Sequence, residues 1–329
     1  DSNEINATTS HTVPNTLPIG NTFNWDVRYK SVESGWGPFS NRTSFSAVKP
    51  TLLFSGSFAE NEVQKIDPST MTQVGSSYTS TSSIEVLTFG PDGFVYGGIR
   101  DATIQKIDPS DMTQVGSSYT GHANNVNALT FATDGFLYSG SADDTVQKID
   151  PSNMTQVGSS YTGHTDRIFA LTFGTDGFLY SGSGDFTVQK IDPSDMTQVG
   201  SSYTGHTNNV RTLTFGSDGF LYSGSNDSTV QKIDPSTMTQ VGSSYTGHTG
   251  TVLSLTFGTD GFLYSGSNDS TVQKIDPSTM TQVGSSYTGH SSNVHNVVFD
   301  DLDGFVYSSS RDNTVQKIDP SDMTQVGSS

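Results

Sequence analysis

The chain has 329 residues, a formal net charge of −18 and no cysteine. The strong negative charge argues against nucleic acid or an anionic membrane as a partner, and the lack of cysteine excludes disulfides and thiol chemistry. No apolar run approaches the ~18 residues that a membrane-spanning helix needs, so we expect no membrane insertion.

The first 48 residues differ in composition from the rest of the chain. Residues 1–22 are polar, which is typical of a linker or an arm. Residues 23–48 begin with apolar side chains at every second position, which predicts a strand with one apolar face. Both tryptophans of the chain belong to this segment, whose main apolar residues are Phe23, Trp25, Val27, Tyr29 and Trp36.

This segment resembles the last strands of a fibronectin type III module, whose first half is absent here. An apolar strand pair with no further sheet to join is an exposed edge, and edge pairing is a common mode of recognition. We therefore predict that the five apolar residues form an assembly interface. Its cover would be the rest of the chain, a second copy, or another part of a longer polypeptide.

From about residue 50 onward the chain repeats one unit. The sequence Gln-Lys-Ile-Asp-Pro-Ser occurs seven times, spaced 41 to 43 residues apart, at Gln64, Gln105, Gln147, Gln189, Gln231, Gln273 and Gln316. Periods of ~40–45 residues are typical of β-propeller blades. The spacing predicts one ring of seven blades over residues 49–329.

Within one unit, four short β-rich runs are separated by turn sequences. In the fifth unit these runs cover residues 210–215, 220–225, 229–233 and 239–245. Gly-Ser-Asp-Gly, Asn-Asp-Ser and Asp-Pro-Ser stand between them and favour tight turns. The predicted fold is all-β: a seven-bladed β-propeller of four-stranded antiparallel blades with a short N-terminal β extension. Counting back by the repeat offset places the innermost strand of the first blade at residues 43–47.

Two further positions repeat with the blades. A Gly-His dipeptide precedes the first strand at His122, His164, His206, His248 and His290. An aspartate follows the second strand in the next turn at Asp143, Asp185, Asp227 and Asp269. These residues resemble WD-repeat propellers, where a histidine, a strand serine, a turn aspartate and a tryptophan form a buried hydrogen-bonded network. The resemblance implies that structural role for the nine residues.

The chain departs from that family at several places. Isoleucine replaces the tryptophan in every copy, so we expect a network of three members. The second blade has Thr81 where histidine is expected, and the first has Glu60 where aspartate is expected. The repeat also looks like the Val-x-x-Ile-Asp-x-x-Thr type of bacterial surface propeller.

One position differs in every copy in which it can be read. It is the second residue of the innermost strand, and six copies carry six side chains: Glu85, Asn127, Phe169, Arg211, Leu253 and His295. Innermost strands line the central channel of a propeller. Two interpretations stay open: a ring diversified to recognise a partner, or solvent-facing positions that drifted after duplication.

We expect no catalytic site, no metal site and no cofactor. Five of the seven histidines occupy the repeated Gly-His position, and no zinc-ligand spacing exists. The acidic cluster Asp300-Asp301-Leu302-Asp303-Gly304 lacks the spaced ligands of a calcium loop, so a solvated hairpin turn is favoured.

The leading functional hypothesis is a non-catalytic interaction or structural module, displayed on a surface or in a multisubunit assembly such as an adhesin, fibre or phage tail. Its partners would be protein or glycan, its location extracellular, on a cell surface or on a virion, and self-assembly would use the N-terminal strands. One alternative is an intracellular WD-repeat scaffold. Another is a lyase-like propeller enzyme using Glu85, Arg211 and His295, which lie on three blades and are expected to be too far apart to cooperate.

Overall fold

A computed structural model describes residues 52–56 and 61–327, together with the backbone of four short strands before them at 22–25, 30–31, 35–36 and 43–46. The chain divides into two compact units, Asp1–Leu52 and Leu53–Ser329. The described residues form strands and turns and contain no helix, so none that could cross a membrane.

The first unit contains two strand pairs. β1 (Thr22–Trp25) pairs antiparallel with β4 (Thr43–Ser46), and β2 (Lys30–Ser31) pairs with β3 (Gly35–Trp36). The side chains of the predicted assembly interface, Phe23, Trp25, Val27, Tyr29 and Trp36, lie outside the described part of the structure. The fibronectin-like resemblance and the interface therefore stay predictions.

The count that placed the innermost strand of the first blade at residues 43–47 stays a prediction, because residues 1–52 form a separate unit. Within that unit β4 pairs with β1, with Phe23 opposite Phe45. Period alone carries no pairing information where the sequence stops repeating.

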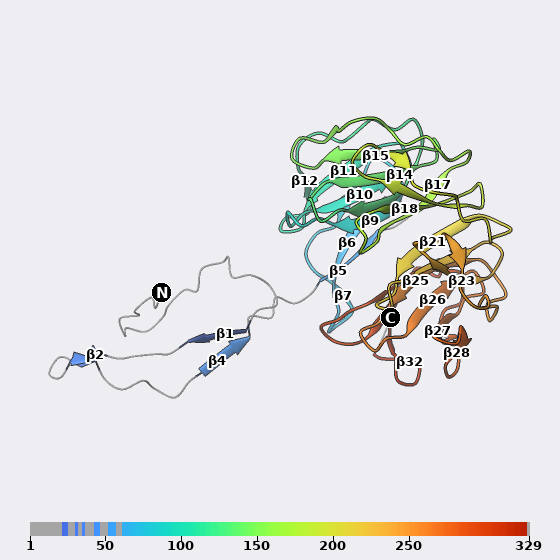
Figure 1. The fold of residues 1–329 in the computed structure, drawn as a ribbon. Helices are drawn as coiled ribbons and strands as arrows, with labels where there is room; N and C mark the ends of the chain where they lie inside the picture. Colours follow the sequence, from blue (N-terminus) through green and yellow to red (C-terminus); the bar gives the residue numbers. More distant parts are fainter. Residues whose placement is uncertain are drawn as a thin grey trace. The chain divides into compact units, whose positions relative to one another are not determined.

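The second unit contains seven antiparallel sheets, which are the blades of a β-propeller (Figure 1). In blade one, β6 pairs with three strands, and the sheet consists of β5 (Leu53–Gly56), β6 (Glu62–Asp67), β7 (Thr72–Gln73) and β8 (Tyr78–Thr79).

Blades two to seven each have four strands in chain order, here called strands a to d from the centre outward. Blades two and three consist of β9 (Ile84–Phe89), β10 (Val95–Ile99), β11 (Ile104–Asp108), β12 (Thr113–Gln114), β13 (Val126–Phe131), β14 (Leu137–Ser141), β15 (Val146–Asp150) and β16 (Thr155–Gln156). Blades four and five consist of β17 (Ile168–Phe173), β18 (Leu179–Ser183), β19 (Val188–Asp192), β20 (Thr197–Gln198), β21 (Val210–Phe215), β22 (Leu221–Ser225), β23 (Val230–Asp234) and β24 (Thr239–Gln240). Blades six and seven consist of β25 (Val252–Phe257), β26 (Leu263–Ser267), β27 (Val272–Asp276), β28 (Thr281–Gln282), β29 (Val294–Phe299), β30 (Val306–Ser310), β31 (Val315–Asp319) and β32 (Thr324–Gln325).

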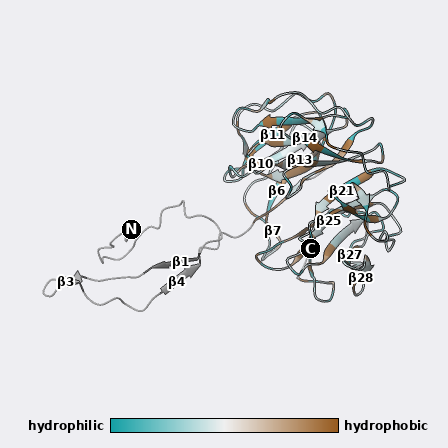
Figure 2. Ribbon diagram, in the orientation of Figure 1, coloured by the Kyte–Doolittle hydropathy of each residue, from teal (hydrophilic) through white to brown (hydrophobic). Residues whose placement is uncertain are grey.

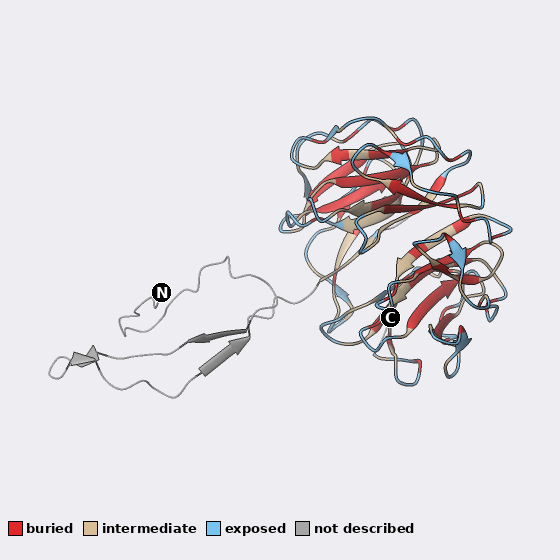
Figure 3. Ribbon diagram, in the orientation of Figure 1, coloured by how far each residue is buried: buried red, intermediate tan, exposed pale blue. Residues whose placement is uncertain are grey.

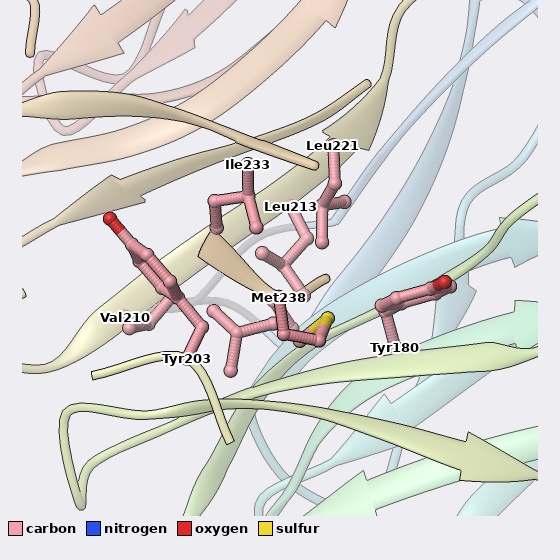
Figure 4. Close-up of a cluster of buried hydrophobic side chains, with 9 residues drawn as sticks. Tyr180, Tyr203, Val210, Leu213, Leu221, Ile233 and Met238 are labelled. Carbon is pink, nitrogen blue, oxygen red and sulfur yellow. The ribbon is translucent and has the colours of Figure 1, made fainter. Parts of the chain in front are cut away.

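The hydrophobic core lies between neighbouring blades. Apolar residues are concentrated within the sheets (Figure 2), and the b strands are buried along their length in blades two to six (Figure 3). In one cluster, Tyr180 and Tyr203 of blade four pack with Val210, Leu221 and Met238 of blade five (Figure 4). Burying one such side chain contributes roughly 1.5–3 kcal/mol, so each blade is stabilised mainly by its neighbours.

A glycine in strand b allows this close packing. A Cβ on Gly224 would lie 2.7 Å from Cγ1 of Val252, which belongs to strand a of the next blade. A contact that short forces the blades apart. The glycine of the repeated Ser-Gly-Ser sequence therefore sets the distance between blades.

Polar contacts also join each blade to the next. The repeated lysine reaches the carbonyl oxygen of the repeated proline one blade on, as in Lys232 Nζ to Pro277 O at 3.1 Å. Lys317 of blade seven reaches Pro68 of blade one at 3.5 Å, which closes the ring. The tyrosine of the repeated Gly-Ser-Ser-Tyr sequence likewise donates to the glutamine of the next blade, as in Tyr78 Oη to Gln105 Oε1 at 2.7 Å.

Every blade has two distinct ends. The turns between strands b and c and the Gly-His loops before strand a lie at one end, which we call the His end. The turns between strands a and b and the Asp-Pro-Ser turns lie at the other, which we call the Lys end because the repeated lysines bond there.

Candidate functional site

The position that differs between copies lies at a β-bulge in each of blades two to seven. In blade five, Val210 pairs with Ser225 and Thr212 pairs with Gly224, so Arg211 has no partner in the ladder. The same register shift occurs at Glu85, Asn127, Phe169, Leu253 and His295. A bulge leaves one residue unpaired and re-aims its side chain, and bulges are common beside functional sites.

Four of these residues line one cavity of about 280 Å³, which lies where the a strands of several blades meet. They are Asn127, Phe169, Arg211 and Leu253, one each from β13, β17, β21 and β25. The residues belong to four consecutive blades, so the cavity is the central channel. The bulge residue stands second in its a strand, next to the Gly-His loop, so these side chains lie near the His end.

Charged side chains gather where the channel opens at the His end, which we call the channel mouth. The guanidinium of Arg211 lies over the ring of Phe169, with 3.9 Å from Cζ to the ring centroid. Glu85 forms an ion pair with Arg100 at 3.2 Å. Arg311 acts on both Glu85 and His295 through its charge.

The pKa values of these groups show that they influence one another. Burial raises the pKa of Glu85, and the positive charges of Arg100, Arg211 and Arg311 oppose that rise. Burial lowers the pKa of His295, and the charges of Arg311 and Arg211 lower it further. The sequence analysis expected Glu85, Arg211 and His295 to be too far apart to cooperate. Arg211 acts through its charge on both Glu85 and His295, although no hydrogen bond joins the three within the described residues.

Each of blades three to seven has the same hydrogen-bonded network at its His end. In blade five, His206 Nε2 lies 2.7 Å from Ser223 Oγ, and His206 Nδ1 lies 2.8 Å from Asp227 Oδ2. Asp227 also accepts hydrogen bonds from Thr229 Oγ1 at 2.7 Å and from the N–H of Thr207 at 3.0 Å.

The same contacts occur around the other histidines and aspartates that the sequence singled out. They join His122 to Asp143, His164 to Asp185, His248 to Asp269 and His290 to Asp312. The threonine is a fourth member that the sequence analysis did not expect. In blade two, Thr81 stands in place of the histidine and donates to Asp101 at 2.5 Å.

The network lowers the pKa of its aspartates. Burial alone would raise the pKa of Asp227, but hydrogen bonds from His206, Thr229 and the backbone lower it well below the usual 3.8. The same causes lower the pKa of Asp143, Asp185 and Asp269, and lower that of Asp312 to about 2. Both carboxylate oxygens of Asp227 accept hydrogen bonds within the fold, so the network holds the loop in place.

The acidic cluster at residues 300–304 is also occupied by internal contacts. Asp303 Oδ2 forms an ion pair with Lys317 at 2.9 Å and accepts a hydrogen bond from Tyr307. Asp300 accepts the N–H of Leu302 at 2.9 Å. Within residues 52–56 and 61–327, no group of His, Asp or Glu is arranged to hold a metal ion.

Two residues near the mouth were missed by the sequence analysis. Arg167 precedes strand a of blade four and acts on Arg211 through its charge. Phe186, in the turn between strands b and c of the same blade, is 42% exposed and has a φ of 70°. A bulky residue in the left-handed region is uncommon. Both stand at positions where the other copies differ, and that signal could have found them.

Comparison with known proteins supports the fold and identifies its family. The sequence pattern described as "WD domain, G-beta repeat" matches residues 113–150, 155–192, 197–234, 239–276 and 281–319. Among solved structures, the chain is similar to the WD40 beta propeller domain of Doa1, with a TM-score of 0.71 and 20% sequence identity. That match covers 80% of this chain and 87% of the other. A search of curated proteins by sequence found no match.

Proposed function

The chain belongs to the WD40 family, whose repeat pattern covers more than half of it, and we propose that it is a protein-interaction scaffold that binds its partner at the His end of the channel. Propellers of this family typically act as non-catalytic interaction modules. Of the hypotheses drawn from the sequence, the WD-repeat scaffold therefore has better support than the surface adhesin, fibre or phage-tail component.

One observation supports the His end of the channel as the binding surface. The side chains that differ between blades are the bulge residues, and four of them line one cavity. The first position and the last three positions of the a strands repeat closely, whereas the third position also differs between copies and lines the same cavity, as Thr212, Ser254 and Asn296 do. Side chains at equivalent positions are expected to be alike where neighbouring blades pack together. They are expected to differ where the ring recognises one asymmetric partner.

The contacts of the mouth suit binding better than catalysis. Catalysis by proton transfer needs an acid or base within hydrogen-bond reach of its partner. Glu85 is paired with Arg100, and no hydrogen bond joins Glu85, Arg211 and His295 within the described residues. These observations support the non-enzymatic reading over the lyase-like one. Glycan binding, self-assembly through the N-terminal strands and the extracellular location stay predictions.

The proposal can be tested by selection from a displayed library of random 12-residue peptides. Hydrogen exchange of the protein with a selected peptide should show protection at the His end, around residues 124–128 and 208–212. Protection confined to the Asp-Pro-Ser turns at the Lys end would contradict the proposal. Failure of every selected peptide to protect the His end would do the same.

A further inference from the structure

The arginines and the repeated lysines of the propeller lie at opposite ends of the blades. In the described residues 61–327, all four arginines stand at positions where the copies of the repeat are not all alike: Arg100, Arg167, Arg211 and Arg311. All four stand at the His end: Arg100 and Arg311 directly follow a b strand, Arg167 directly precedes an a strand, and Arg211 is the bulge residue of blade five. Their charges act on Glu85, His295 or Arg211.

The repeated lysines are neutralised at the Lys end. In blades two to seven each lies within 3.5 Å of an aspartate in the turn between strands a and b, as Lys232 lies 2.7 Å from Asp218. Each also lies over the ring of a phenylalanine, as Lys232 does over Phe220 at 4.4 Å. These cations have their countercharges within the fold.

Two of the four arginines at the mouth have a carboxylate close by. Arg100 pairs with Glu85 at 3.2 Å, and Arg167 lies 3.6 Å from Asp166. Within the described residues, neither Arg211 nor Arg311 has a carboxylate at ion-pair distance. Glu85 is the one glutamate after residue 62, so it is the one carboxylate that a bulge position supplies to the channel.

The surroundings of Arg211 are those of an anion-binding guanidinium. Phe169 holds it from one side, which fixes its plane and leaves its N–H groups to bond other acceptors. Asn127 lines the same cavity, and its amide is held by Ile168 O at 3.0 Å. The cavity of about 280 Å³ is large enough for one acidic side chain.

Resting on the proposed function, we propose that the channel mouth binds a negatively charged side chain of a partner peptide, with Arg211 and Arg311 as its cationic ligands and Glu85 as an internal competitor. The shared chemistry is an anionic group, either a carboxylate or a phosphoryl group. An overall charge of −18 would repel an acidic partner at long range, but the arginines act within a few ångströms, where local charge decides binding.

The test uses a fixed probe, a labelled 12-residue peptide of alternating Glu and Ser, and measures its affinity by fluorescence anisotropy. Its analogues replace Glu with Gln, or replace Glu with Gln and phosphorylate the serines. We expect the Gln peptide to bind roughly tenfold more weakly or worse, because a charge-assisted hydrogen bond is lost. Tighter binding of the phosphorylated analogue would assign the natural anion as phosphate, and tighter binding of the Glu peptide would assign it as carboxylate.

Variants of the protein make the inference specific. Arg211→Met should weaken binding of the Glu peptide roughly tenfold or more, and Arg211→Lys should restore part of it. Glu85→Gln should strengthen binding, because it removes the competing carboxylate. Lys232→Met is the matched control: it removes one cation from the same blade at the Lys end and should leave the affinity unchanged. Circular dichroism would verify that each variant is folded.

Two results would overturn the inference: equal binding of the Glu and Gln peptides, or weaker binding by Glu85→Gln. If selected library peptides protect the His end yet bind Arg211→Met as tightly as the unchanged protein, the anion site fails and the proposed function stands. If no peptide protects the His end, the proposed function itself fails.

Discussion

The two ends of the blades use the same repeat for different purposes. At the Lys end, a lysine, an aspartate and a proline carbonyl make the same contacts in blade after blade, as Lys190 does with Asp176 and Pro235 at 2.7 and 3.1 Å. At the His end, a repeated network of His, Ser, Asp and Thr supports loops and bulges whose outer residues differ. Different residues therefore stabilise the fold and distinguish the blades from one another, and substitutions can change the two separately.

The largest expected effect is the loss of the His-end networks in acid. The five aspartates paired with histidines have a lower pKa in the folded chain than the usual 3.8. Their stabilisation is complete above the unfolded pKa and is lost as pH falls through the folded pKa. The urea midpoint should change little between about pH 5 and 7 and should fall steeply below about pH 4. A midpoint that stays constant to pH 3 would show that the networks contribute little.

A single network can be broken by Asp227→Ala. The substitution leaves His206, the hydroxyl of Thr229 and the N–H of Thr207 without their acceptor. Unpaired groups of this kind should lower the free energy of unfolding by about 3 kcal/mol. Urea denaturation measures the loss, and Asp234→Ala, in an exposed turn at the Lys end, is the control with a much smaller expected effect.

At the Lys end, Lys232→Met should have a smaller effect. The variant loses the ion pair with Asp218 and the bond to Pro277 O, but keeps the apolar stem of the side chain. Because Asp218 is one-third exposed, we expect a loss of about 1 kcal/mol, measured by the same denaturation. A loss equal to that of Asp227→Ala would show that the two ends contribute equally to stability.

The bulge position should be nearly neutral for folding. Leu253→Asn introduces the residue that blade three carries at the equivalent bulge, Asn127. The free energy of unfolding should change by less than about 0.5 kcal/mol, because the position lies in the half-exposed wall of the channel. Peptides selected on this variant should differ from those selected on the unchanged protein. A large loss of stability with unchanged selection would show that the bulge has only a structural role.

Much of the fold could be predicted from residues that act locally. The proline and aspartate of each Asp-Pro-Ser turn end strand c, a glycine marks each turn between strands a and b, and an aspartate marks each turn between strands b and c in blades two to seven. The seven b and c strands lie where the sequence placed them, as β22 and β23 do in blade five. The innermost strand of blade one falls where the sequence stops repeating, so its place at residues 43–47 stays a prediction.

The candidate site was predicted in part. The sequence identified the six differing positions, and their place at a bulge explains why each can vary without disturbing the ladder. It did not show that Arg100, Arg167 and Arg311 act on the same group of charges. Nor did it show that the repeated lysine joins neighbouring blades, as Lys232 does through its bond to Pro277 O of the next blade.

By itself, the sequence determined the number of blades, the order of their strands and the residues that differ between copies, because each depends on a period and on turns a few residues long. Only the tertiary structure decided which of those residues meet. Phe169 and Arg211 are one blade apart in the sequence, and they stack in the channel because consecutive blades pack with their a strands, β17 and β21, side by side. That contact depends on the spacing between blades, and the spacing is set by packing around glycines such as Gly224, which lies on a different strand from either residue.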